Sequence, residues 1–170
     1  MKISFMKLAL FATWLFSITP VWAEPIHTNS YGVWSKTLFA DTATVDNGPT
    51  RFIFVAGMAA EDPKDGHILF KGDFAGQCQM AYRKIHDALA AQHATMNDIV
   101  RTTAYLTDMR DKDAYQKCQR DAMGKAELPP HTLLGVNSLA WPGMLVEVEV
   151  TAIAPHNTTP APYTNKCLIK

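Results

Sequence analysis

The feature that most constrains the fold is the alternating pattern of residues 144–154, MLVEVEVTAIA. Because successive side chains of a strand point to opposite faces, every second residue from Val146 to Ala152 would lie on one face. Those residues are valine or alanine, whereas Glu147 and Glu149 would lie on the opposite face. The pattern therefore predicts a strand in a sheet that is covered on one face and open on the other.

Two segments have the spacing of amphipathic helices. The first opens at Asp73, a good N-cap residue, and the second opens at Asp108 or Asp111 and ends at Gly124. The first has the apolar stripe Phe74, Cys78, Ala81, Ile85 and Leu89, opposite Arg83, Lys84, Asp87 and Gln92, and the second has the stripe Tyr115, Cys118 and Ala122. Two helices with one apolar stripe each can cover only one face of a sheet.

Extended segments surround these helices in the order β-β-β-α-β-α-β-β, which is an α+β arrangement. Residues 128–154 predict two adjacent strands with a turn at 141–143. We expect His131 and Leu133 on the open face with Glu149, while Leu134 and Val136 point the other way. The predicted strands are residues 34–45, 51–56, 67–70, 98–106, 131–139 and 144–154, with a turn at 46–49.

Residues 1–23 have the pattern of a secretory signal peptide. Lys2 and Lys7 precede an apolar run, and Val21-Trp22-Ala23 supplies small residues at the −3 and −1 positions before Glu24. We therefore expect a periplasmic or secreted protein that has no membrane segment after cleavage. Residues 24–154 would form one domain, and the proline-rich residues 155–170 a tail.

The net charge and the cysteine spacing argue against nucleic acid and metal ions as ligands. Removing residues 1–23 removes two of the 16 basic residues and none of the 16 acidic ones, so the net charge becomes about −2. Nucleic acid is therefore a poor default partner. Cys78, Cys118 and Cys167 have no metal-ligand spacing, and the histidines show no metal-like cluster, so no metal site is expected. The cysteines are read as buried thiols or as one disulfide to Cys167 from either of the others.

Several segments, taken as a set, resemble the RidA family, also called YjgF/YER057c/UK114. They are IFVAG within 52–57, GDF…Q at 72–77, NDIV at 97–100, YLTDM at 105–109 and LVEVEVTAIA at 145–154. The resemblance implies a chorismate-mutase-like fold with a mixed sheet and two helices packed on one face. It also implies a homotrimer with a small-molecule pocket at each subunit interface and no cofactor.

The resemblance also implies a chemistry and a set of site residues. Family members deaminate enamines and imines such as 2-aminoacrylate, with an arginine holding the substrate carboxylate and a glutamate ordering water or moving protons. Glu149 matches that glutamate, but His131 stands in the place of the arginine. Ala56 stands where a serine often precedes Gly57, and Phe39 stands at a tyrosine position.

These substitutions leave more than one function open. In an imine or enamine hydrolase with altered activity, Glu149 would position water and His131 would move a proton, in a pocket lined by Phe39, Leu133 and the Ala56-Gly57 backbone. Alternatively, the same pocket binds a small metabolite without catalysis, and a chaperone-like interaction role is a weaker third hypothesis. Neutral imidazole cannot replace a bidentate guanidinium, so the standard 2-aminoacrylate reaction should be weak or absent.

Overall fold

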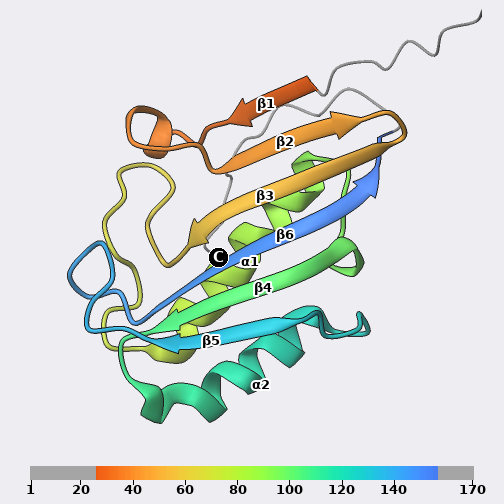
Figure 1. The fold of residues 1–170 in the computed structure, drawn as a ribbon. Coiled ribbons are helices and arrows are strands. Elements are labelled where there is room, and N and C mark those ends of the chain that lie inside the picture. The colour runs from red at the N-terminus through yellow and green to blue at the C-terminus, as the bar shows by residue number, and fades with distance from the viewer. Residues whose placement is uncertain (1–25, 157–170) are drawn as a thin grey trace, which may run out of the picture.

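The computed structural model describes residues 26–156, and these form one mixed sheet with two helices on one of its faces (Figure 1). The six strands lie in the order β1-β2-β3-β6-β4-β5, and every neighbouring pair is antiparallel except β4 and β5. The elements are β1 (Ile26–Ser30), β2 (Thr42–Asn47), β3 (Thr50–Met58), α1 (Phe74–Ala91), β4 (Ile99–Leu106), α2 (Lys112–Met123), β5 (His131–Gly135) and β6 (Val146–Pro155). The predicted fold class is confirmed.

The core lies between the helices and the covered face of the sheet. Val146, Val148, Val150 and Ala152 of β6 are all buried there, as their alternation predicts. The apolar stripe of α1 packs against these residues. The opposite face carries Glu147 and Glu149 and has no helix over it within residues 26–156. Among these residues no helix is long and apolar enough to span a membrane.

Helix α1 begins as expected, because the Asp73 side chain accepts a hydrogen bond from the backbone N–H of Gly76 at 3.0 Å. Its predicted polar face is wrong at two positions, since Lys84 and Gln92 are buried. The Lys84 ammonium lies 2.6 Å from the carboxylate of Glu61, and Gln92 donates to Ser30 at 3.3 Å. The Lys84 ammonium and the Gln92 amide nitrogen each meet a partner from another part of the chain, while the Gln92 Oε1 atom is buried without one.

Helix α2 follows a short 3-10 turn, Met109–Asp111, which the side chain of Asp108 caps by accepting from the backbone N–H of Arg110. The helix ends at Gly124, whose φ of 58° suits glycine. A disulfide between Cys78 and Cys118, with Cα atoms 6.4 Å apart, joins α1 to α2. The expectation of free buried thiols or a bond to Cys167 is therefore wrong. Cys167, like the predicted signal peptide and residues 157–170, lies outside the described residues.

The strands depart from prediction near the N-terminus. Residues 34–45 contain a 3-10 turn, Ser35–Thr37, before β2 begins at Thr42. Residues 67–70 form no strand, only a single bridge between Glu61 and Ile68. The third N-terminal strand is instead β1, whose five residues IHTNS have no clear alternation and lie at the sheet edge beside β2. The predicted turn is present, with φ of 60° at Gly48 between β2 and β3.

The two C-terminal strands are not adjacent, because β4 lies between β5 and β6. In the register of these three strands, Thr102 of β4 pairs with both His131 and Val150. Residues paired across a sheet share a face, so His131 lies on the covered face with Val150. The next row joins Thr132, Thr103 and Glu149 on the open face.

Candidate functional site

The open face of the sheet is hollowed around Glu149. A cavity of about 200 Å³, here called the Glu149 hollow, is lined by Phe54, Val55, Arg101, Thr103, Glu149, Val150 and Thr151. Strands β3, β4 and β6 supply all of these residues, so the hollow lies on rigid strands and not on loops. Tyr105 of β4 donates its hydroxyl to Glu149 Oε1 at 3.3 Å. The predicted glutamate thus lies in a polar depression with a fixed donor beside it.

Arg101 is the cation of this hollow, and sequence reasoning missed it. Its Cα is paired with that of Thr151, two residues after Glu149 on the same face of β6, and its side chain is exposed on the open face. An arginine in a strand is easily taken for a solvated residue, and only the register brings it beside Glu149. Burial first, and then the charges of Glu149 and Glu147, raise the pKa of Tyr105, so its hydroxyl remains a donor at neutral pH.

A second cavity on the same face, here called the Glu147 pocket, has a volume of about 300 Å³. It brings together three predicted substrate-binding residues, Phe39, Ala56 and Gly57, although their role in binding stays a prediction. The remaining lining residues are Glu61, Ala140, Trp141 and Glu147. The tripeptide 141–143 is not a hairpin turn, since the strands on either side of it do not pair, and Trp141 forms a wall of the pocket.

Glu147 is half-buried on the open face of the sheet. Burial, and then the negative charges of Glu61 and Glu149, raise its pKa, while Lys84 acts in the opposite direction. Gly57 makes room for this carboxylate, because a Cβ at position 57 would collide with the Glu147 side chain. Glu147 is therefore not an ordinary solvated carboxylate.

His131 does not meet Glu149 within the protomer. Its ring stacks on Tyr115 of α2, with ring centroids 5.5 Å apart and planes 16° from parallel. Burial lowers the pKa of His131, whereas a Glu149 partner would have raised it. Leu133 likewise packs against the core below the helices.

The predicted open-face position of these two residues is therefore wrong. The reason is that β5 is an edge strand with leucines at both 133 and 134, so its own pattern does not fix which face is covered. Their predicted roles in catalysis and binding are untested, but neither side chain contributes to the hollow or the pocket described above.

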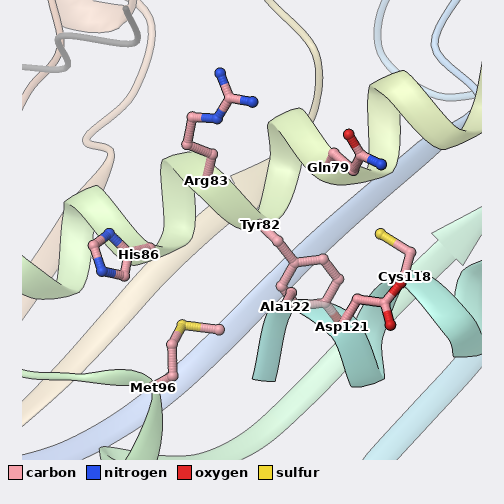
Figure 2. Close-up of a pocket in the computed structure, with 8 residues that line it drawn as sticks. All are labelled: Gln79, Tyr82, Arg83, His86, Met96, Cys118, Asp121 and Ala122. Atoms are coloured by element: carbon pink, nitrogen blue, oxygen red, sulfur yellow. The ribbon is translucent and has the colours of Figure 1, made fainter. Parts of the chain in front are cut away.

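A further cavity of about 380 Å³ lies on the other side of the molecule, between α1 and α2 (Figure 2). Tyr82 extends from α1 toward α2, and Cys118 and Asp121 line the opposite wall. Arg83 projects from α1 away from α2. No predicted site residue lines this groove.

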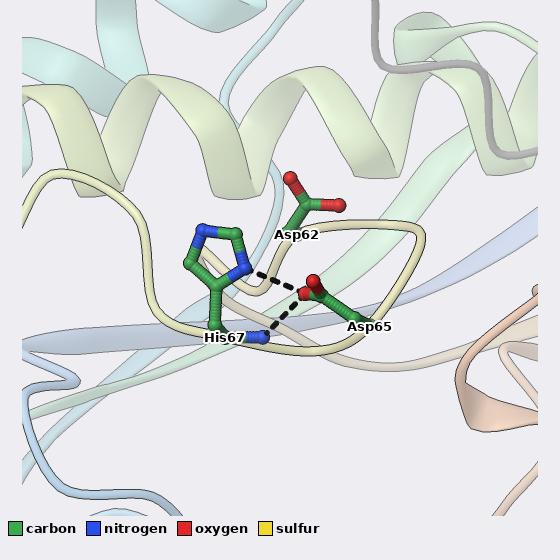
Figure 3. Close-up of side chains that lie close together, drawn as sticks. All are labelled: Asp62, Asp65 and His67. Carbon is green, nitrogen blue, oxygen red and sulfur yellow. Dashed lines mark hydrogen bonds and ion pairs between the residues drawn. The ribbon is translucent and has the colours of Figure 1, made fainter.

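The expectation that no histidine joins acidic residues in a metal-like cluster is also wrong. Asp62, Asp65 and His67 place one potential ligand atom each within 4.8 Å of one another (Figure 3). The His67 Nδ1 lies 2.6 Å from Asp65, and the two side chains are 57% and 65% exposed. Exposed acidic groups of this kind gather on many surfaces without a metal, so the arrangement does not by itself define a site.

The comparisons agree with the fold. Residues 42–154 match the family described as Endoribonuclease L-PSP. A RutC family protein from Pyrococcus abyssi is 33% identical over 124 residues, covering 69% of this chain and 95% of the relative. A mouse protein named 2-iminobutanoate/2-iminopropanoate deaminase is 26% identical over 103 residues, covering 61% of this chain and 74% of that relative.

A solved structure leads to the same family. It is a YjgF/YER057c/UK114 family member from Mycobacterium tuberculosis, with a TM-score of 0.61 and 27% identity. The match covers 76% of this chain and 100% of that one. Together with the sequence match over residues 42–154, this confirms the resemblance read from the sequence. The chain belongs to the RidA (YjgF/YER057c/UK114) family.

Proposed function

We propose that the protein hydrolyses a small imine or enamine bound at the Glu149 hollow. The observation that carries this proposal is the placement of Glu149 and Arg101 on the walls of one hollow. Glu149 is oriented by the hydroxyl of Tyr105, and the hollow is about 200 Å³, which suits a small substrate. The named activity of the mouse relative is of the same class.

The geometry supports a simple division of roles. Arg101 would hold a substrate carboxylate, since a guanidinium can donate two hydrogen bonds to it. Glu149 would take a proton from water as the water oxygen bonds to the imine carbon, and would return that proton to the nitrogen. The C–N bond of the carbinolamine then breaks as Glu149 carries the hydroxyl proton to the nitrogen, which leaves as ammonia while the C–O bond becomes a carbonyl. His131 has no step in this scheme, because its ring lies on the covered face of the sheet, where it stacks on Tyr115 of α2.

The proposal includes assembly and location. We expect a homotrimer in which the open sheet faces are buried against neighbouring copies, so that the small-molecule site is completed at each subunit interface. We also propose export to the periplasm or outside the cell, on the strength of residues 1–23. No cofactor is required by the chemistry. A monomer in sedimentation experiments would remove the interface site.

A rate measurement tests the reaction. The protein is given imines made in place by an amino-acid oxidase, and release of ammonia and keto acid is compared with the uncatalysed rate. We expect acceleration, and a fall of about 10²-fold or more in Glu149→Gln. Glu127→Gln, which changes an exposed carboxylate in the segment after α2, is the matched control and should leave the rate unchanged. No acceleration with acidic, neutral and bulky imines would exclude the hydrolase.

A non-catalytic binding protein is the second candidate. It is favoured by the position of His131, which replaces the family's carboxylate-binding arginine and stacks on Tyr115. In that case the protein would bind an imine or its carbonyl product without accelerating hydrolysis. Calorimetric binding measured beside the rate assay separates the two functions.

A further inference from the structure

The Glu147 pocket has an ion pair beside it that the hydrolase scheme does not use. Lys84 of α1 lies 2.6 Å from Glu61, and both side chains are only 3% exposed. Lys84 also donates to the carbonyl of Ala59 at 3.2 Å, and Glu61 accepts from the backbone N–H of Ala59 at 3.2 Å. Burying such a pair costs much of what its attraction returns, so stability alone does not explain it.

The charges around this pocket do not balance. Glu61 and Glu147 both line it, and Lys84 neutralises only one of them. Among the described residues, Glu147 forms no hydrogen bond or ion pair with a basic group. When Glu147 is ionised, the pocket therefore holds one negative charge more than it can pair within the protomer. A bound proton or a bound cation would remove that excess.

The remaining walls of the pocket suit an organic cation. Phe39 and Trp141 line it, and Trp34 holds both rings edge-on, with centroids 5.6 Å and 5.4 Å away. Aromatic faces attract ammonium groups, and most strongly where water is excluded. A substrate carboxylate would instead meet two glutamates.

We propose that the Glu147 pocket binds a small organic cation, a protonated amine or iminium with an apolar substituent. The charged group lies against Glu147, and the substituent lies between Phe39 and Trp141. The pocket volume of about 300 Å³ limits the ligand to one aromatic ring with a short substituent. This proposal concerns binding and does not depend on the hydrolase, although the pocket and the Glu149 hollow share one sheet face.

Three probes of nearly one shape test the proposal on the full chain by calorimetry. They are benzylammonium, benzyl alcohol and benzoate, which differ mainly in charge. We expect benzylammonium to bind at least tenfold more tightly than benzyl alcohol, and benzoate, whose carboxylate suits Arg101 in the other hollow, to leave benzylammonium binding unchanged. Equal affinities of benzylammonium and benzyl alcohol, or displacement of benzylammonium by benzoate, would overturn the proposal. Since benzylammonium has no C=N bond, the result is the same whether or not the chain hydrolyses imines.

Two variants locate the site. Glu147→Gln should weaken benzylammonium binding at least tenfold, whereas Glu127→Gln should leave it unchanged. Trp141→Leu should weaken it by roughly threefold to thirtyfold, the range of a cation–π contact. Unchanged affinity in a folded Glu147→Gln protein would show that the cation binds elsewhere. If that variant does not fold, the probe series on the unaltered chain still decides the proposal.

The pH dependence gives a further check. The charged and titratable groups facing Glu147 are Glu61 from the loop after β3, Lys84 from α1, Glu149 from its own strand and Tyr105 from β4. Because burial raises the pKa of Glu147, benzylammonium affinity should increase as the pH rises from about 4.5 and Glu147 ionises. The increase should be absent in Glu147→Gln. A pH profile shared by both proteins would contradict the assignment of the cation to Glu147.

Discussion

His131 and Glu149 lie in neighbouring rows of the sheet and project from opposite faces. His131 pairs with Thr102, which pairs with the buried Val150, while Glu149 pairs with Thr103. The stack of His131 on Tyr115 makes position 131 part of the packing between β5 and α2. A change at this position should therefore act on stability first, and on chemistry at Glu149 only through the assembly.

The pKa of His131 gives the first prediction. Burial lowers it from 6.5, so the folded protein favours the neutral ring. The stability supplied by that ring is complete above about pH 6.5 and is lost as the pH falls below it. The loss should stay under about 1 kcal/mol, because the ring is more than a third exposed.

Urea denaturation at about pH 5 and about pH 8 measures this loss. We expect the unaltered protein to lose more unfolding free energy at the lower pH than His131→Phe does. The control is His27→Phe at an exposed position of the edge strand β1, which should leave the difference in unfolding free energy between the two pH values as it is in the unaltered protein. The prediction is wrong if His131→Phe and the unaltered chain lose the same amount.

The second prediction concerns the buried ion pair. Lys84→Met leaves the Glu61 carboxylate buried and without its cation, and should cost about 3–5 kcal/mol of unfolding free energy. Adding Glu61→Leu to Lys84→Met removes the stranded charge and should recover most of that loss. Chemical denaturation of the two single variants and the double variant gives the coupling energy directly.

A surface pair serves as its control. Lys117 and Asp121 of α2 are also 2.6 Å apart, but their side chains are 73% and 64% exposed. The same cycle there should give a coupling of about 0.5 kcal/mol or less. Equal couplings for the two pairs would show that burial does not govern the strength of the Lys84–Glu61 interaction.

Strand β6 and the Lys84–Glu61 pair show which parts of the fold could be predicted from the sequence and which could not. The alternation of β6 predicted its buried face correctly, because valines on one side and glutamates on the other leave a single choice of face. Helical spacing failed at Lys84, since its partner Glu61 is 23 residues away in a loop. Periodicity assigns a lysine to solvent and carries no information about such a partner.

The sequence predicted some residues of the candidate site and missed others. The missed ones depend on contacts between segments that are far apart in the chain. Family resemblance named Phe39, Ala56 and Gly57, which the fold brings into one pocket. Resemblance could not point to Arg101, because its closeness to Glu149 depends on the pairing of β4 with β6. Strand alternation misplaced His131, because an edge strand with apolar residues at successive positions takes its covered face from the neighbouring strand.

The disulfide gives the third prediction. Cys78 and Cys118 close a loop with a sequence separation of 40, so their bond restricts the unfolded chain considerably. Replacing both with alanine should lower the unfolding free energy by about 4 kcal/mol. Urea denaturation of the unaltered protein and of the double replacement, both under non-reducing conditions, measures the loss. Cys167→Ala is the matched control and should have little effect, and a loss as large as that of the double replacement would indicate that the pairing includes Cys167.

The last prediction separates the roles of Arg101 and Glu149 if the protein is a hydrolase. Arg101→Gln should raise KM for an imine that carries a carboxylate by about tenfold or more and leave KM for a neutral imine unchanged, because only the acidic substrate uses the guanidinium. Glu149→Gln should lower kcat for both substrates, since each needs the same proton transfer. Arg83→Gln on α1 removes an exposed arginine from the opposite side of the molecule and should change neither constant. Equal effects of Arg101→Gln on acidic and neutral imines would mean that Arg101 supports the sheet face and does not bind the substrate, and the carboxylate would then have to be held by a group from a neighbouring copy.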